Sequence, residues 1–263
     1  MRSAISERKN VSGGIVGAMS EVHAFDTFHV ESRVGLLRYG SMGVVSHPAL
    51  EPFATLVDEY NVLFRAADLT PHVPAFIDAC LTVEGFRCCH ISAGLDVTLG
   101  EDRLPFTDDI RDHVWHTAQW FTAFVRALDD GPNASVCTFV WDQSSLIMTR
   151  VDARIVVYDP GAGAESPFSH PASFPLEAYA RQLLTAGHEL ETLCTTVLAE
   201  LRRRGMDRER RESLVKNDYD LDSRRFPPDP ERILAIVHHE FDRPELAPAL
   251  ASIGRHLTAN QPA

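Results

Sequence analysis

The chain has almost no lysine, and its positive charge is too sparse to support binding to nucleic acid. Only Lys9 and Lys216 are lysines, and 25 basic residues in all face 37 acidic ones, which leaves a formal net charge of −12. A protein that binds a polyanion draws its affinity from a concentrated basic patch. The one concentration of arginine, residues 202–211, is interrupted by Asp207 and Glu209 and is typical of a solvated helix end. We therefore expect no nucleic-acid partner.

Long apolar runs are also missing. No stretch approaches the roughly 18 apolar residues that a membrane helix needs. The apolar residues 13–19 form a short, glycine-rich stretch that is too weak for a signal peptide. We expect a disordered leader over residues 1–20, with Met19 as an alternative to Met1 for the translation start, and a cytoplasmic location with no membrane contact. The preference for arginine over lysine, with many Ala, Pro and Asp residues, suggests a bacterial source.

The sequence also lacks the common catalytic and metal-binding motifs. The five cysteines include no Cys-x-x-Cys pair, so a structural zinc site is not expected. Neither a Gly-x-Ser-x-Gly elbow nor a Gly-rich phosphate loop occurs. The run His238-His239-Glu240 resembles the start of a zinc-protease motif, but Arg243 stands where that motif needs its second histidine. No cofactor and no metal are predicted, and the absence of a motif leaves open whether the chain is an enzyme.

Apolar periodicity predicts both strands and helices. We expect strands at residues 25–30, 34–39, 44–45, 86–99, 104–106, 135–141, 145–151 and 154–158. We expect helices at residues 50–67, 74–83, 107–131, 176–204, 230–241 and 245–257. The strands precede the helix-only part of the chain and are joined by short turns. This order predicts an α+β fold, with an antiparallel sheet of meanders and hairpins flanked by helices and a C-terminal helical segment.

The same pattern divides the chain into three parts after the leader. Residues 21–160 form the expected α+β domain, and residues 161–175, rich in Gly, Ser and Pro, are expected to be a linker or surface loop. Residues 176–263 are the expected helical segment. Because a long apolar helix stripe must be buried against something, we expect this segment to dock on the α+β body. An independent helical domain is the alternative.

The most suggestive cluster of reactive side chains lies on the predicted helix 107–131. Asp109, Asp112, His113 and His116 are spaced three and four residues apart, so they share one side of a helix. Such a patch offers two ligands for a divalent metal, but zinc needs three or four. Helix physics explains the same residues without a ligand, because acids favour a helix N-terminus and Asp112 with His116 forms an i,i+4 pair. We prefer that structural interpretation.

The charge distribution leads to the functional hypothesis. Residues 21–110 hold five arginines against fourteen acidic residues, so the deficit of positive charge sits mainly in the first half. If this acidity serves more than solubility, a basic protein is the natural partner. We expect a non-enzymatic, acidic protein-binding module, immunity- or antitoxin-like in character, that neutralises or scaffolds a basic partner through a flank formed by His113, His116 and Trp120. The alternative is a hydrolase or transferase whose metal or acid-base site lies around Asp109 to His116.

Overall fold

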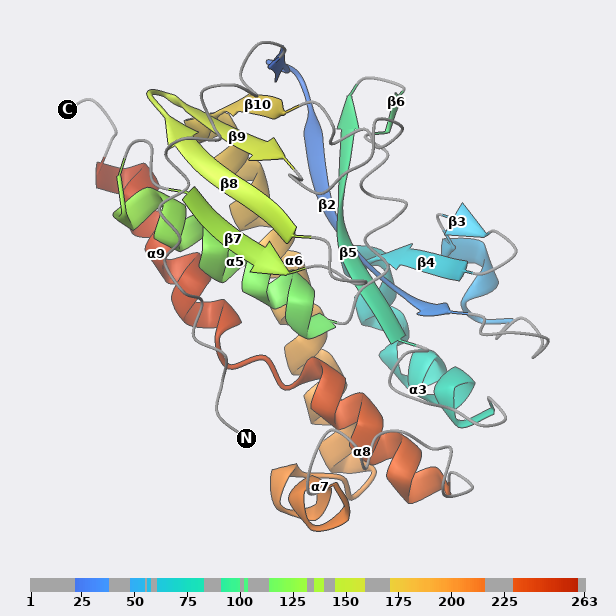
Figure 1. Cartoon of the computed structure of the whole chain (residues 1–263). Helices are drawn as coiled ribbons and strands as arrows, with labels where there is room; N and C mark the ends of the chain where they lie inside the picture. The colour runs from blue at the N-terminus through green and yellow to red at the C-terminus, as the bar shows by residue number, and fades with distance from the viewer. Residues whose placement is uncertain are drawn as a thin grey trace.

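The structure, a computed structural model, describes residues 22–37, 48–54, 56–57, 61–82, 91–99, 102–103, 114–131, 135–139, 145–158, 171–215 and 229–259. Within these residues the strands form two five-stranded sheets. Sheet A has the strand order β1-β10-β9-β8-β7 and sheet B the order β3-β4-β2-β5-β6. Helices cover both sheets (Figure 1). The predicted α+β class, with antiparallel pairing and C-terminal helices, is confirmed.

The elements have the following bounds. Sheet A contains β1 (His23–Ala24), β7 (Ser135–Phe139), β8 (Ser145–Val151), β9 (Arg154–Tyr158) and β10 (Ala172–Pro175). Sheet B contains β2 (His29–Leu37), β3 (Leu56–Val57), β4 (Asn61–Arg65), β5 (Ile91–Leu99) and β6 (Asp102–Arg103). The helices are α2 (Ala66–Leu69), α3 (Val73–Thr82), α5 (Val114–Asp129), α6 (Leu176–Arg203), α7 (Arg208–Leu214), α8 (Pro230–Phe241) and α9 (Leu246–Ala259), with two short 3-10 helices, η2 (Glu51–Phe53) and η3 (Thr70–His72).

Sheet A follows the predicted hairpins closely. Antiparallel pairing joins β7 to β8 and β8 to β9, and Asp152 takes a positive φ of 52° in the two-residue turn between the last two strands. The composition of residues 161–175 does not predict β10, which pairs antiparallel with β9 and parallel with β1. Residues 172–175 are extended because they pair with β9 and β1. The composition of the segment alone does not encode this pairing.

Sheet B corrects the prediction of a helix over residues 50–67. Its central strand, β2, pairs antiparallel with β4 on one side and with β5 on the other. The segment 50–67 instead contains η2, β3, β4 and the start of α2. Apolar residues such as Leu56 and Phe64 fit helical spacing in the sequence. Because Val62 and Phe64 align with Leu36 and Val34 of β2, strand pairing overrides that spacing.

The 28-residue helix α6 packs against both sheets, on β2 of sheet B and on β9 and β10 of sheet A. At the edge of β2 that β4 leaves uncovered, the side-chain amide of Gln182 donates to the Phe28 carbonyl at 2.7 Å and accepts from the Val30 amide at 2.8 Å. On the other flank of α6, Gly187 lies against α5 and α9. Gln182 therefore satisfies backbone groups that would otherwise need another strand.

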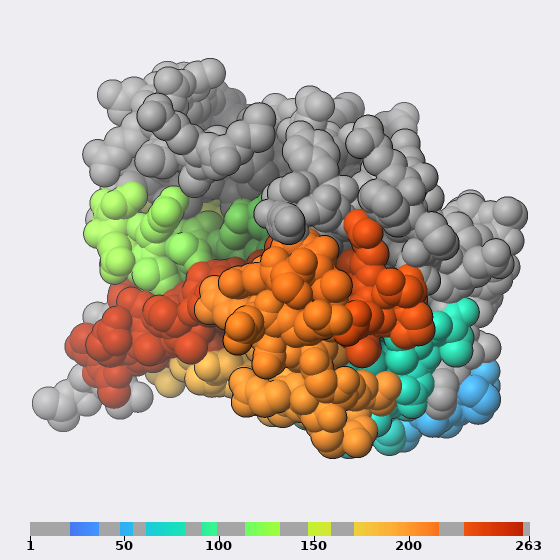
Figure 2. Space-filling view, turned by 90° about the horizontal axis from the view of Figure 1, so that it is seen from below, coloured from blue at the N-terminus to red at the C-terminus, as the bar shows by residue number. Residues whose placement is uncertain are grey.

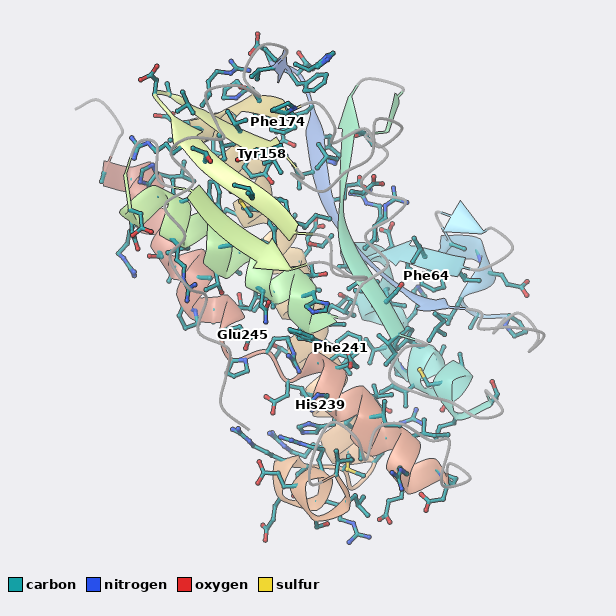
Figure 3. All side chains as sticks on the ribbon, viewed as in Figure 1. Phe64, Tyr158, Phe174, His239, Phe241 and Glu245 are labelled. Carbon is teal, nitrogen blue, oxygen red and sulfur yellow. The ribbon has the colours of Figure 1, made fainter. Side chains whose placement is uncertain are left out.

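One hydrophobic core runs through the described residues. Its buried members extend from Phe28 on β2 to Leu257 on α9. Phe174 of β10, Phe64 of β4 and Phe241 of α8 mark how widely the core spreads (Figure 3). None of the helices in the described ranges combines the length and the apolarity that crossing a bilayer requires.

Candidate functional site

The helix singled out by the sequence is present as α5, but most of its candidate site is not described. Asp109, Asp112 and His113 lie outside the described residues. His116 is half-buried on the first turn of α5, with its ring centroid 3.4 Å from that of Trp115. A catalytic or metal-binding role for this cluster stays a prediction. Among the residues that the structure does describe, no three His, Cys, Asp or Glu side chains are grouped so as to hold a metal ion.

Trp120 contributes to the core of the chain. Its side chain is only 7 % exposed, and its indole Nε1 donates to the hydroxyl of Tyr179 on α6 at 3.1 Å. Burial raises the pKa of Tyr179, so this hydroxyl stays neutral. The indole is therefore occupied inside the fold, and the contact role expected for the flank of His113, His116 and Trp120 stays a prediction.

The buried cysteines of the described residues are not reactive thiols. Cys80 on α3 and Cys194 on α6 are both buried and not in disulfides. Burial raises the pKa of Cys80 and raises that of Cys194 to about 12, with the nearby Arg243 lowering the latter only partly. Because the thiolate is the nucleophile, neither cysteine is ionised near neutral pH.

Four charged side chains form a compact cluster on one face of sheet B, which we call the charge lattice: Glu31, Arg33, Arg65 and Asp96. The register places Arg33 directly opposite Arg65, and Glu31 directly opposite Asp96. Like charges in such positions repel. Diagonal ion pairs offset this repulsion, with Arg33 Nη2 2.6 Å from Asp96 Oδ2 and Arg65 Nε 3.3 Å from Glu31 Oε1.

The charge lattice is charge-balanced, and all its side chains except that of Arg65, which is 37 % exposed, are largely shielded from water. The side chain of Asp96 is 3 % exposed, that of Arg33 10 % and that of Glu31 13 %. His29 extends it toward solvent, with Nε2 3.0 Å from Glu31 Oε1. Two carboxylates matched by two guanidinium groups hold one another in place, so the lattice is suited to fixing β2, β4 and β5 in register. We assign the charge lattice a structural role and not a binding role, because each of its carboxylates already has a cationic partner within the chain.

A different surface has the marks of a contact site. Phe53, in η2, is the large hydrophobic side chain that stands exposed among the described residues, at 37 %. Its ring stacks on that of His72 in η3, with centroids 3.9 Å apart. Glu51 and Pro52 beside it are exposed as well. From below, η2 (blue) lies next to α3 (teal) at one side of the molecule (Figure 2).

The arginine-rich end of α6 is occupied by ion pairs within the chain. Arg203 and Arg204 both donate to Glu200, and these hydrogen bonds lower the pKa of Glu200 to about 2. Arg204 also donates to Asp78 on α3 at 2.6 Å. The arginines of α7 that follow are also paired: Arg208 with Glu212, Arg210 with Glu231 and Arg211 with Asp242. This pairing supports the expectation that residues 202–211 are a solvated helix end and not a binding patch for anions.

Comparison of the chain with known proteins identifies no relative. No protein-family model, curated protein or solved structure matches the chain. The surface around Phe53 was not found from the sequence, because the periodicity assigns Phe53 to the apolar side of a helix. Phe53 and His72 are brought together only by the folded connections around β3, β4 and α2, and no local pattern encodes that contact.

Proposed function

We propose that this protein is a non-enzymatic, acidic protein-binding module that contacts a basic partner through the surface formed by η2 and η3. With this proposal we keep the expectation of a bacterial, cytoplasmic protein. The observation that carries it is the exposure of Phe53, stacked on His72. Aromatic side chains are enriched at the centres of protein interfaces, where a few residues supply most of the binding energy.

Geometry explains why Phe53 suits such a role. Its ring is held at the surface by His72, so little side-chain entropy remains to be lost on binding. The exposed ring of Phe53 stabilises a complex only when a partner covers it and removes its apolar surface from water.

Charge complements this apolar contact. Glu51 is exposed two residues before Phe53 in η2, and Asp68 on α2 has a side chain that is 45 % exposed. Both belong to residues 21–110, where acids outnumber arginines fourteen to five. Such an excess steers a basic partner toward the surface and gives it selectivity against acidic ones.

The test begins with capture of partners from an extract of the source cells on the immobilised full chain. Captured proteins are identified by mass spectrometry, produced separately, and titrated against the chain by calorimetry. We expect F53A to weaken binding at least about tenfold, which is the loss typical of an interface hot spot. Partners that bind F53A as tightly as the unchanged chain would refute the proposed surface.

Phe25 offers a matched control. It also stacks on a histidine, His23, with ring centroids 6.4 Å apart, but it directly follows β1 of sheet A, whereas η2 precedes β3 of sheet B. We expect F25A to bind the partner with unchanged affinity. Thermal unfolding of both variants separates loss of contact from loss of fold, because Phe25 packs partly on the core.

A further inference from the structure

The short helix α7 is attached to the molecule in an unusual way. It has seven residues, and none of them is buried. Leu214 packs partly against the core, and the fully buried residues at the two ends of α7 are the flanking Met206 and Val215. Asp207 caps its first turn by accepting from the Arg210 amide at 2.8 Å. On the molecular surface α7 and the end of α6 (orange) are bordered by α8 and α9 (red), as seen from below (Figure 2).

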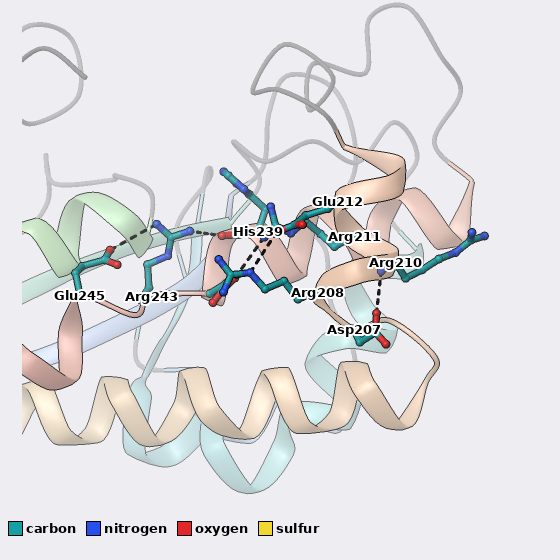
Figure 4. A network of polar contacts seen from close by, with 9 residues as sticks. Asp207, Arg208, Arg210, Arg211, Glu212, His239, Arg243 and Glu245 are labelled. Atoms are coloured by element: carbon teal, nitrogen blue, oxygen red, sulfur yellow. Dashed lines mark hydrogen bonds and ion pairs between the residues drawn. The ribbon is translucent and has the colours of Figure 1, made fainter. Parts of the chain in front are cut away.

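Ion pairs join α7 to both ends of α8. Arg210 reaches Glu231 in the first turn of α8, with Nε 2.9 Å from Oε1. At the other end, Arg211 and Arg208 both approach Asp242, with nitrogens 3.4 Å and 3.9 Å from Oδ2 (Figure 4). Because the apolar contact of α7 with the core is limited to the partly buried Leu214, α7 depends on these charges to stay closed.

A buried histidine lies one helical turn before Asp242, on the same side of α8. This residue, His238, is 5 % exposed, and its Nδ1 is buried without a hydrogen-bond partner. The charges that act on it most are Asp242 on its own helix and Arg211 and Arg208 on α7. Glu212 of α7 accepts from both arginines. Helices α3, α5 and α6 also pack on α8, and none of their described charged groups is among these.

From this arrangement we infer that residues 207–214, which we call the α7 clasp, open when His238 takes up a proton, while Met206 and Val215 stay in the core. Asp242 is the one carboxylate of the described residues shared by these three groups, and it already balances two arginines. A third cation at His238 adds repulsion from Arg208 and Arg211 and competes with them for Asp242. Opening of the clasp exposes the imidazolium to water and relieves both effects.

The direction of the pH effect follows from burial. Burial lowers the pKa of His238 in the closed state, with Asp242 opposing and Arg211 and Arg208 adding to the shift. In the open state the ring titrates near pH 6.5, as an exposed histidine does. The open state therefore binds the proton more readily, and the clasp is favoured above about pH 6.5 and weakened as the pH falls below that value.

Hydrogen-deuterium exchange of the full chain tests the inference. The exchange rate is measured on peptides that cover residues 206–215 and is corrected for the pH dependence of intrinsic exchange. Between pH of about 7.5 and about 5.5 we expect the opening constant to rise several-fold, up to about tenfold, which is the limit for one histidine. At pH of about 7.5, raising salt to about 0.5 M should also speed exchange, because it screens the ion pairs.

Two variants and a matched control decide the cause. H238Q should lose the pH dependence, and D242N should exchange fast in residues 207–214 already at pH of about 7.5. H188Q, which removes an exposed histidine of α6 that pairs with Glu191, should behave as the unchanged chain. Exchange that is independent of pH in the unchanged chain, or a pH effect that survives H238Q, would overturn the inference.

A second measurement covers the case in which H238Q does not fold. Proton NMR of the unchanged chain follows the ring resonances of His238 and His188 through a pH titration. A midpoint for His238 well below that of His188 supports the inference. A midpoint at or above it contradicts the inference, because the closed clasp would then favour the proton.

Discussion

At the scale of single residues, Asp96 is the most deeply buried member of the charge lattice. It is almost fully buried, it lies directly opposite Glu31, and Arg33 sits 2.6 Å away. Removing one partner of a buried ion pair leaves the other charge uncompensated in a medium that solvates it poorly. The register of sheet B therefore depends more on this carboxylate than on any exposed pair.

This difference predicts two contrasting substitutions. D96N should lower the free energy of unfolding by about 3 kcal/mol, because it leaves Arg33 buried beside Glu31 alone. D26N breaks the pair between Asp26 and Arg154, where Asp26 is 76 % exposed, and should cost less than about 1 kcal/mol. Urea unfolding of the three proteins measures both values. Equal losses would mean that the charge lattice has no special role.

Single residues also show where the sequence was informative. Proline at the first helical position and aspartate before it mark the start of α8 at Asp229-Pro230. The contact between Phe53 and His72 has no such signal, since it joins two 3-10 turns that are separated by two strands and a helix.

At the scale of elements, α6 owes its close packing to a glycine. A Cβ atom built on Gly187 would lie 2.2 Å from Leu250 Cδ2 on α9 and 2.6 Å from Phe121 Cε1 on α5. Gly254 on α9 is different, since the nearest atom to its Cβ position is Leu184 Cδ2 at 4.0 Å. One glycine permits three helices to meet, whereas the other only weakens its helix.

Alanine at these two glycines should therefore have opposite effects. We expect G187A to destabilise the protein by about 1–3 kcal/mol through overpacking. G254A should stabilise it by about 0.5–1 kcal/mol, because alanine favours the helix and finds room. Thermal unfolding gives the sign of each change directly. A stabilising G187A would show that α6 does not approach α5 and α9 as closely as the structure has it.

Elements with a strong apolar stripe were the ones that the sequence located well. The bounds expected for α3, α6, α8 and α9 are within about two residues of those observed. The prediction of a helix over residues 50–67 was wrong because the apolar residues of this segment fit both the helical and the strand period. Pairing of β4 with β2 selects the extended conformation. The helix α7 was not expected either, because it has no apolar stripe and depends on charges to hold it.

At the scale of the whole molecule, charge is distributed in two different ways. The arginines of the C-terminal half are largely engaged with acids inside the chain, as at Arg204 with Asp78 and at Arg210 with Glu231. The first half has too few arginines to do the same for its own acids. An excess of negative charge beside an exposed aromatic ring is the basis of the proposed binding function.

The most direct test of this account is the rate at which the purified partner associates with the chain, followed by stopped-flow fluorescence as salt rises from about 0.05 M to about 0.5 M. Electrostatic steering of a basic partner predicts an association rate that falls about tenfold or more over this range, because the Debye length shrinks from about 14 Å to about 4 Å. The same series with F53A should show an unchanged association rate and faster dissociation, since the ring acts only at contact. An association rate that does not respond to salt, or a partner that is itself acidic, would contradict the proposed function.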